Sequence, residues 1–280
     1  MVSLLLIAAF IGAAVGSFVN VWVLRTREGE SIKGRSRCPG CGTTLQWFEL
    51  IPLLSFLFLR GRCRSCRGAI SLQYPIVEAL CAAGFVVVAW RWALLLDQAA
   101  QGWAALLWLV AWWGIVAVSL ALAVYDALAR EVPQRWLWYL VGLSVVAGCA
   151  ERLIHDVPFL IAAVTTLTSA AVVAFPLGAL WLVSRGRWLG EADVWVAFSL
   201  GALFGWPQGF SALVLSFWIG AGFVGIAWLF HQAASLAPPL GRLGRLLPRP
   251  RSGQALPFVP FMVASLWTTF AFSWNVFGLY

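Results

Sequence analysis

Charged residues are scarce in this sequence of 280 residues. Asp, Glu, Lys and Arg together make up 11% of the chain, whereas 62% of it is hydrophobic and the mean hydropathy is +0.88. About a quarter of the residues of a soluble globular protein are charged, so that class is excluded. The abundance of apolar residues also excludes an intrinsically disordered chain. What remains is a protein that crosses a membrane several times.

Hydrophobic runs long enough to cross a bilayer recur along the chain. A transmembrane helix needs about 20 predominantly apolar residues. The runs predict helices rather than barrel strands, because they are continuously apolar and do not alternate. Only 13 residues form the sixth run, so we expect its helix to begin earlier, near Trp188. Eight spans are predicted, at Val2–Leu24, Tyr74–Leu96, Gly102–Tyr125, Trp136–Ala150, Pro158–Val183, Val194–Trp206, Phe210–Phe230 and Ala255–Gly278.

The basic residues follow the expected topology. With eight spans, seventeen of the nineteen Lys and Arg residues fall on one side, in residues 25–73, 126–135, 184–192 and 231–254. Only Arg91 and Arg152 lie at the other face. Because basic loops stay in the cytoplasm, the N-terminus is expected outside the cytoplasm. The net charge of +8 is explained by topology, so no nucleic-acid partner is expected, and membrane lipid surrounds the chain.

The fold class predicted is an all-α integral membrane protein with a small cytoplasmic domain between its first two transmembrane helices. We expect a first helix at residues 1–24, a cytoplasmic zinc-binding domain at residues 25–73, and a seven-helix membrane domain at residues 74–280.

Four of the six cysteines lie in the long polar segment, as Cys38-Pro-Gly-Cys41 and Cys63-Arg-Ser-Cys66. Two such pairs supply the four tetrahedral ligands of a structural Zn²⁺ site. Two disulfides are the alternative, but they would need an oxidising compartment. The remaining cysteines, Cys81 and Cys149, sit in apolar runs and are expected to be buried without ligand roles.

Between the two cysteine pairs lies an apolar stretch, residues 45–59, which Pro52 interrupts. It is too short to span a membrane comfortably. It is expected to lie along the membrane surface, to cover the zinc site, or simply to pack under the cytoplasmic loop.

Two aspartates are the most informative residues. Asp126 ends the third predicted span and Asp193 begins the sixth, so the two intervening spans return the chain to the face it left. Ionisable residues at a membrane boundary are candidates for a functional site. Two carboxyls at one depth indicate an aspartyl pair that shares a proton and activates water. The alternative is helix capping, which suits Asp193 near a helix N-terminus better than Asp126 near a C-terminus. Glu78 and Glu191 are the other acidic residues that could take part in such a site in place of an aspartate.

These residues resemble the type IV prepilin peptidases, which are leader peptidases and N-methyltransferases. The resemblance lies in Gly16–Arg25 (GSFVNVWVLR), the two cysteine pairs with ELIPLLSFL between them and ISLQYPIVE after them, YDALAREVP at Asp126, GEADV at Asp193, and ALPFVPF at 255–261.

The resemblance implies Asp126 and Asp193 as the catalytic pair in a fold of eight membrane helices with a cytoplasmic zinc-binding domain. It implies cleavage of the basic leader of prepilins or pseudopilins after a Gly at the cytosolic face, and methylation of the new N-terminus with S-adenosylmethionine as donor. Partners from a pilus or a type II secretion system follow from the same resemblance, as does a place in the bacterial inner membrane with the N-terminus in the periplasm and the zinc-binding domain and active site in the cytoplasm.

The family pattern around the second aspartate is Gly-x-Gly-Asp-x-Lys. Here Ala192 replaces its second Gly and Trp195 replaces its Lys. In residues 255–261, which we call the late segment, Val259 replaces a Gly. No G-x-G-x-x-G fingerprint marks a donor site. Gly16, Ser17 and Asn20 share one helix face, which favours either a functional role or close packing of helices. Two other hypotheses stay open: a zinc-stabilised scaffold without activity, and a proton-coupled transporter.

Overall fold

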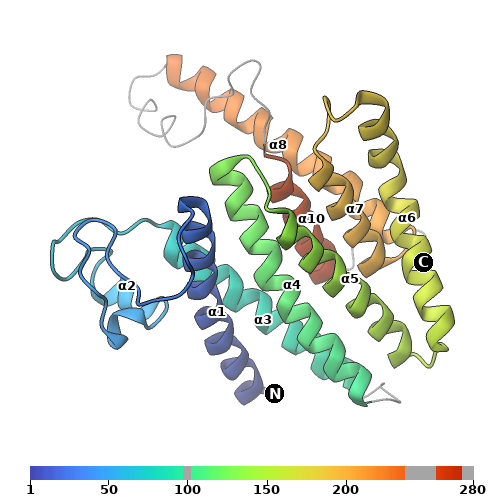
Figure 1. The fold of residues 1–280 in the computed structure, drawn as a ribbon, viewed down its shortest axis with the longest axis horizontal. Helices are drawn as coiled ribbons and strands as arrows, with labels where there is room; N and C mark the ends of the chain where they lie inside the picture. The colour runs from blue at the N-terminus through green and yellow to red at the C-terminus, as the bar shows by residue number, and fades with distance from the viewer. Residues whose placement is uncertain (97–101, 237–256, 273–280) are drawn as a thin grey trace.

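The chain folds into helices, as Figure 1 shows for the computed structural model, which describes residues 1–96, 102–236 and 257–272. Among these residues the only strand-like pairings are two isolated bridges, so the prediction of an all-α chain is confirmed. The helices are α1 (Val2–Glu28), η1 (Trp47–Leu50), α2 (Leu54–Phe58), α3 (Gln73–Leu96), α4 (Gly102–Ala129), α5 (Gln134–Ile154), α6 (Phe159–Ser184), α7 (Glu191–Phe204), α8 (Gln208–Leu236) and α10 (Val259–Phe272).

Six helices are long and apolar enough to cross a bilayer: α1, α3, α4, α5, α6 and α8. They make the chain a multi-pass membrane protein. In the described structure α7 and α10 have 14 residues each, which is about 21 Å of helix against a hydrocarbon core of about 30 Å. The sixth and eighth predicted spans therefore stay predictions, and part of the eighth lies outside the described residues.

Two helix ends differ from expectation. The helix α1 continues to Glu28, past the boundary expected at residue 24, and ends at Gly29 with a φ of 70°. Arg25 and Arg27 extend it because they are good helix formers whose charged ends reach water. The helix α7 begins at Glu191 rather than near Trp188, because Gly190 takes an extended conformation as its N-cap.

Helices α1 and α3 pack closely because glycine residues on α1 face α3. A Cβ atom on Gly12 would lie 2.7 Å from the Cβ of Phe85, and one on Gly16 would lie 2.7 Å from the Cα of Glu78. Any larger residue would push the helices apart, as in other membrane helix pairs that meet through small residues. The contact fixes the end of α1 beside the start of α3.

The short helix α7 lies between longer helices (Figure 1). A Cβ atom on Gly148 of α5 would collide with the carbonyl oxygen of Ala202, and one on Gly201 would lie 2.6 Å from the carbonyl oxygen of Ser169 in α6. Gly148 on α5 and Gly201 on α7 itself therefore let the backbones of α5 and α6 approach α7 closely.

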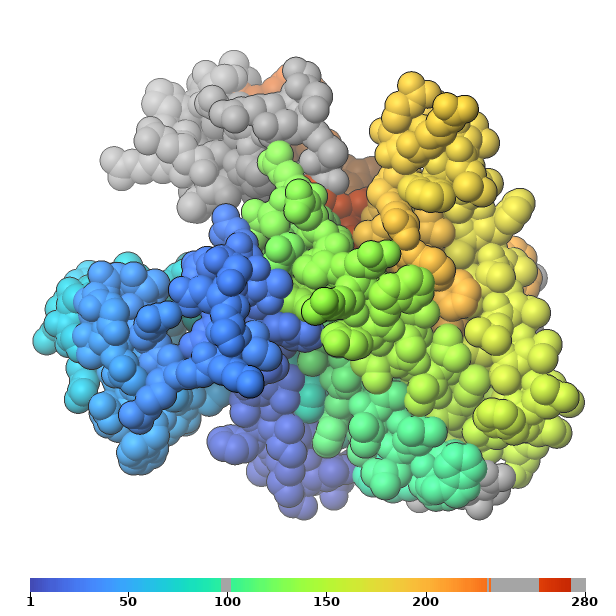
Figure 2. Space-filling model, in the orientation of Figure 1, coloured from blue at the N-terminus to red at the C-terminus, as the bar shows by residue number. Residues whose placement is uncertain are grey.

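The residues between α1 and α3, 29–72, form a lobe that we call the Cys lobe. Figure 2 shows it at the left of the membrane bundle, beside α1. Its two helical elements, η1 and α2, cover only nine residues. So small a lobe cannot build a large apolar core.

Candidate active site and metal centre

The four cysteine sulfurs of the Cys lobe converge on one point. The Sγ atoms of Cys38, Cys41, Cys63 and Cys66 all lie within 4.8 Å of one another. Four thiolates around one Zn²⁺ ion stand about 3.8 Å apart, given a Zn–S bond of about 2.3 Å, and Cys38 Sγ lies 3.9 Å from Cys66 Sγ. All six cysteines of the chain have free thiols, contrary to the disulfide alternative. The cluster can hold a metal ion.

Each cysteine pair forms the same tight turn, which is why the sulfurs converge. In the first turn the Cys38 N–H donates to the carbonyl oxygen of Thr43, and Gly42 N–H donates to that of Cys38. In the second turn Cys63 N–H donates to Gly68, and Arg67 N–H donates to Cys63. The residue after each second cysteine has a positive φ, 71° at Gly42 and 60° at Arg67.

The thiols are electrostatically dissimilar. The hydroxyl and backbone of Thr43 hydrogen-bond the sulfur and lower the pKa of Cys41 to about 6. Backbone hydrogen bonds from Cys66 and Ser65 lower the pKa of Cys63. A backbone hydrogen bond from Gly68 acts to lower the pKa of Cys66, but the surrounding sulfurs outweigh it and raise that pKa to about 11. Because neighbouring sulfurs oppose the ionisation of one another, four thiolates stay this close only around a cation at their centre.

The apolar stretch between the cysteine pairs leaves large side chains exposed. The exposed fractions are 76% for Trp47, 71% for Leu57 and 79% for Phe58. The stretch therefore does not bury these side chains beneath the lobe. Among the alternatives for residues 45–59, this exposure favours a position along the membrane surface, where such residues meet lipid.

Glu78 anchors this stretch to the membrane bundle. Its Oε2 accepts a hydrogen bond of 2.8 Å from the backbone N–H of Leu53, which has a φ of 61°. Glu78 is buried, and a left-handed conformation is costly for a leucine. The acidic residue on α3 is thus engaged in holding the Cys lobe to α3.

Asp126 lies in the last turns of α4 and is 5% exposed. Its Oδ2 accepts a hydrogen bond of 3.2 Å from the backbone N–H of Val259, at the start of α10. The partner residue comes from the late segment that resembles the prepilin peptidases; Ala255 and Leu256 of that segment lie outside the described residues. No cap of α4 uses this carboxylate, because its bond runs to another helix.

Asp193 lies in the first turn of α7 and is 8% exposed. Its Oδ2 accepts a hydrogen bond of 3.2 Å from the N–H of Gly190. This side chain therefore does cap its helix, as the alternative expected.

The two aspartates lie at the same end of the bundle. Helices α4 and α7 run in opposite directions (Figure 1), and the rings of Trp112 and Phe204 pack with centroids 6.2 Å apart. Asp126 is about 21 Å along α4 from Trp112, and Asp193 is about 17 Å along α7 from Phe204. Both carboxyls therefore stand at similar depth, at the end from which the Cys lobe extends.

The residues that depart from the family pattern pack against their neighbours. The indole N–H of Trp195 donates to Glu191 Oε1 at 3.1 Å, and its ring lies 4.7 Å from that of Trp138 on α5. Ala192 packs at the edge of the core. Glu191 is exposed and bonded to Trp195, so this acidic residue stands apart from the buried aspartates.

Polar side chains of the segment from Gly16 to Arg25 bond the backbone of α1, of α3 and of the start of the Cys lobe. The amide of Asn20 donates to the carbonyl oxygens of Gly16 and Tyr74 at 3.3 and 3.2 Å. The guanidinium of Arg25 donates to the carbonyl oxygens of residues 31, 32, 33 and 35. Of the two alternatives for this face, the contacts favour close packing.

Two family models and several known proteins match this chain. The model of the bacterial peptidase A24 N-terminal domain matches residues 10–92, and the model of the type IV leader peptidase family matches residues 113–225. A prepilin leader peptidase/N-methyltransferase of Aeromonas hydrophila is 30% identical over 233 residues, which cover 83% of this chain and 70% of that protein.

The chain belongs to the type IV leader peptidase family. A member from Pseudomonas putida is 29% identical over 291 residues, 93% of this chain and 88% of the relative. A shorter match to a Myxococcus xanthus member is 55% identical over 71 residues, 25% of this chain and 21% of that protein. No solved structure matches the chain. The family model spans both Asp126 and Asp193, and the N-terminal model spans all four clustered cysteines.

Three contacts in this family member were not predicted from its sequence: the Val259 bond to Asp126, the Leu53 bond to Glu78, and the ion pair of Arg64 with Glu49 at 3.3 Å. Two of them use a backbone N–H, which carries no sequence signal. The acidic Glu78 within an apolar run was the available signal for the second.

Proposed function

We propose that this member of the family is an aspartic endopeptidase that removes the leader from prepilins or pseudopilins, with Asp126 and Asp193 as its catalytic pair. The family assigns prepilin processing to the chain. One observation carries the choice of residues: two buried carboxyls stand at one end of the bundle, and each is oriented by a backbone N–H.

The chemistry needs no covalent nucleophile. Two neighbouring carboxyls do not ionise together readily, so the pair holds one proton. The ionised member takes a proton from a water molecule, which attacks the peptide carbonyl, and the protonated member donates to the carbonyl oxygen. Asp193 is assigned the ionised role because the N-terminus of α7 stabilises negative charge, whereas the C-terminal end of α4 opposes it at Asp126.

The depth of the pair suits the substrate. A prepilin presents a hydrophobic helix in the bilayer and a basic leader in the cytosol, so its scissile bond lies at the boundary. Acidic side chains at the end of the bundle reach that bond without unfolding the helix. The inner membrane with a periplasmic N-terminus and a cytoplasmic Cys lobe and active site is the arrangement proposed, based on the basic residues.

The metal proposed for Cys38, Cys41, Cys63 and Cys66 is Zn²⁺. Four thiols suit its tetrahedral preference, and four protein ligands leave no open position for catalysis. Its role is therefore structural: binding stabilises a lobe with little core of its own.

Methylation of the new N-terminus, with S-adenosylmethionine as donor, is the second activity proposed. It rests on the names of the relatives, which are prepilin leader peptidase/N-methyltransferases. The residues that bind the donor are not assigned. A pilus or a type II secretion system is the proposed setting.

Product analysis tests both activities at once. Purified protein in lipid is incubated with a prepilin and S-adenosylmethionine, and mass spectrometry follows leader loss and methyl addition. We expect Asp126→Asn and Asp193→Asn each to abolish leader loss. Asp156→Asn, which removes the same charge from an exposed residue at the other end of the bundle, should cleave normally. Cleavage by both aspartate variants would refute the catalytic assignment.

The other two hypotheses are not favoured. A scaffold without activity would leave the buried carboxyl pair unexplained. A proton-coupled transporter would place such carboxyls near the midplane, whereas Asp126 and Asp193 lie at helix ends.

A further inference from the structure

A cavity lies between α1 and α5, at the end of the bundle that carries the aspartates. Its volume is about 520 Å³, and its lining includes Trp22 and Thr26 of α1 and Gln134, Arg135, Trp136 and Tyr139 of α5. Sites for small molecules and cofactors have volumes of about 300–1,000 Å³. The cavity is therefore large enough for such a molecule.

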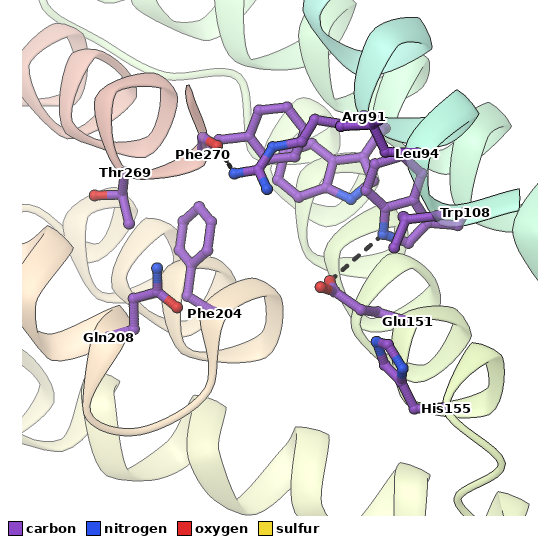
Figure 3. A pocket seen from close by; sticks show the side chains of 11 residues that line it. Arg91, Leu94, Trp108, Glu151, His155, Phe204, Gln208, Thr269 and Phe270 are labelled. Atoms are coloured by element: carbon purple, nitrogen blue, oxygen red, sulfur yellow. Dashed lines mark hydrogen bonds between the residues drawn. The ribbon is translucent and has the colours of Figure 1, made fainter. Parts of the chain in front are cut away.

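The cavity adjoins the end of α4 that carries Asp126. The ring of Trp136 lies 5.3 Å from that of Tyr125, the residue that precedes Asp126. Another cavity, shown in Figure 3, lies beside Glu151. Because Glu151 is about 22 Å along α5 from Trp136, that cavity stands at the opposite end of the bundle. A molecule that reacts with the product of leader cleavage therefore suits the cavity between α1 and α5.

The lining of this cavity offers accessible aromatic rings. Tyr139 is 54% exposed, and Trp22 is partly exposed. The ring of Trp136 lies 4.3 Å from that of Trp22 and supports it from α5. Aromatic faces attract cations, so the lining suits a ligand with a positively charged centre.

The lining also offers one guanidinium. Among the described residues Arg135 forms no ion pair. It lies in the first turn of α5, where the helix dipole also favours a negative group. A carboxylate is therefore the expected partner of Arg135, whereas the basic leader of a prepilin would meet it as a like charge.

Trp22 gives a second role to the α1 segment from Gly16 to Arg25. Asn20 uses one face of the helix for its bond to α3. Trp22 and Thr26 lie one turn apart on another face and line the cavity. The segment thus packs against α3 and forms one wall of the cavity.

We propose that this cavity binds S-adenosylmethionine, the methyl donor of the second activity proposed above, on which this inference rests. The rings of Trp22 and Tyr139 hold its positively charged sulfonium, and Arg135 pairs with its carboxylate. When bound, the donor supplies its methyl group: the lone pair of the new terminal amine bonds the methyl carbon, the C–S bond breaks with its electron pair left on sulfur, and the amine nitrogen releases a proton to water. That amine is produced at Asp126 and Asp193, so a donor beside the end of α4 lies near it.

Equilibrium dialysis tests the proposal on the full-length protein in lipid nanodiscs, with radiolabelled S-adenosylmethionine and S-adenosylhomocysteine. The second compound keeps the adenosine and the carboxylate, but its sulfur is uncharged. Tyr139→Leu should therefore weaken the binding of S-adenosylmethionine about fivefold and that of S-adenosylhomocysteine far less. Arg135→Gln should weaken both about tenfold, because both carry the carboxylate.

Trp138→Leu is the matched control, because it removes an exposed ring of the same helix from outside the cavity. It should bind both compounds as the wild type does. Ultraviolet cross-linking of methyl-labelled donor needs no variant, and it should label a peptide that contains Tyr139. Label confined to the Cys lobe would contradict the proposal.

Binding separates failure of this site from failure of the methyltransferase activity. Unchanged affinity for S-adenosylmethionine in Tyr139→Leu and Arg135→Gln would overturn the site alone. A wild type that binds neither compound and adds no methyl group would overturn the site together with the activity. Loss of affinity for a prepilin in Tyr139→Leu, with affinity for S-adenosylmethionine retained, would assign the cavity to the substrate instead.

Discussion

The backbone N–H of Val259 donates a hydrogen bond of 3.2 Å to the Oδ2 of Asp126, across 133 positions of the sequence. The bond joins the start of α10 to the end of α4. It orients one oxygen of the buried carboxylate and satisfies an N–H group at the N-terminus of a helix, which has no partner within its own helix. The late segment therefore completes the proposed active site through its backbone.

The first prediction concerns this residue. Val259→Gly keeps the N–H, so prepilin cleavage should persist. The side chain is buried, and its loss should lower the stability by about 2 kcal/mol. Thermal unfolding in lipid measures the stability, and leader removal measures the activity. Loss of cleavage at a temperature where the variant is folded would show that the side chain, and not the backbone, supports Asp126.

Glu78 is predicted to hold the Cys lobe in place. Glu78→Leu removes the acceptor of the Leu53 N–H, and a hydrogen bond to a buried charged group contributes about 1.5–3 kcal/mol. Hydrogen exchange at the Leu53 amide should therefore accelerate about tenfold or more.

Two matched variants check the anchor. Glu78→Gln keeps an acceptor oxygen and should change the exchange far less, and Glu30→Gln alters an exposed residue and should have no effect. Unchanged exchange in Glu78→Leu would contradict the anchoring role.

Metal binding should stabilise the Cys lobe alone. Metal analysis of the purified protein should find about one zinc ion per chain, and Cys38→Ser should lose it. Limited proteolysis should then cut residues 29–72 while the membrane helices stay protected, because their packing does not involve the cluster. Cys81→Ser and Cys149→Ser remove thiols outside the cluster and should retain zinc. Equal zinc loss in those two variants would exclude the four-cysteine site.

The exposed stretch from Trp47 to Phe58 is predicted to contact lipid. A photo-crosslinking amino acid at position 58 should yield lipid adducts in bilayers, because Phe58 is exposed and apolar. The same amino acid at Ser65, an exposed polar position in the second cysteine turn, should yield few. Comparable adducts at the two positions would show that the stretch does not lie on the membrane surface.

Sequence alone determined the membrane class, the six long spans and the cysteine cluster. Apolar runs of about 20 residues have one stable outcome in lipid, and two C-x₂-C turns bring their sulfurs together through local geometry. Span counting also placed Asp126 and Asp193 on one face, since an even number of crossings returns the chain to its starting side.

Only the tertiary structure decided what those side chains contact. It gave Asp126 a partner on α10 and turned Glu78 towards Leu53. It also gathered Arg91, Glu151 and Thr269 around one cavity. Such contacts depend on how helices distant in sequence rotate and cross, and packing of small residues such as Gly12, Gly148 and Gly201 sets that geometry. The hydrophobic pattern of the sequence does not predict this packing geometry.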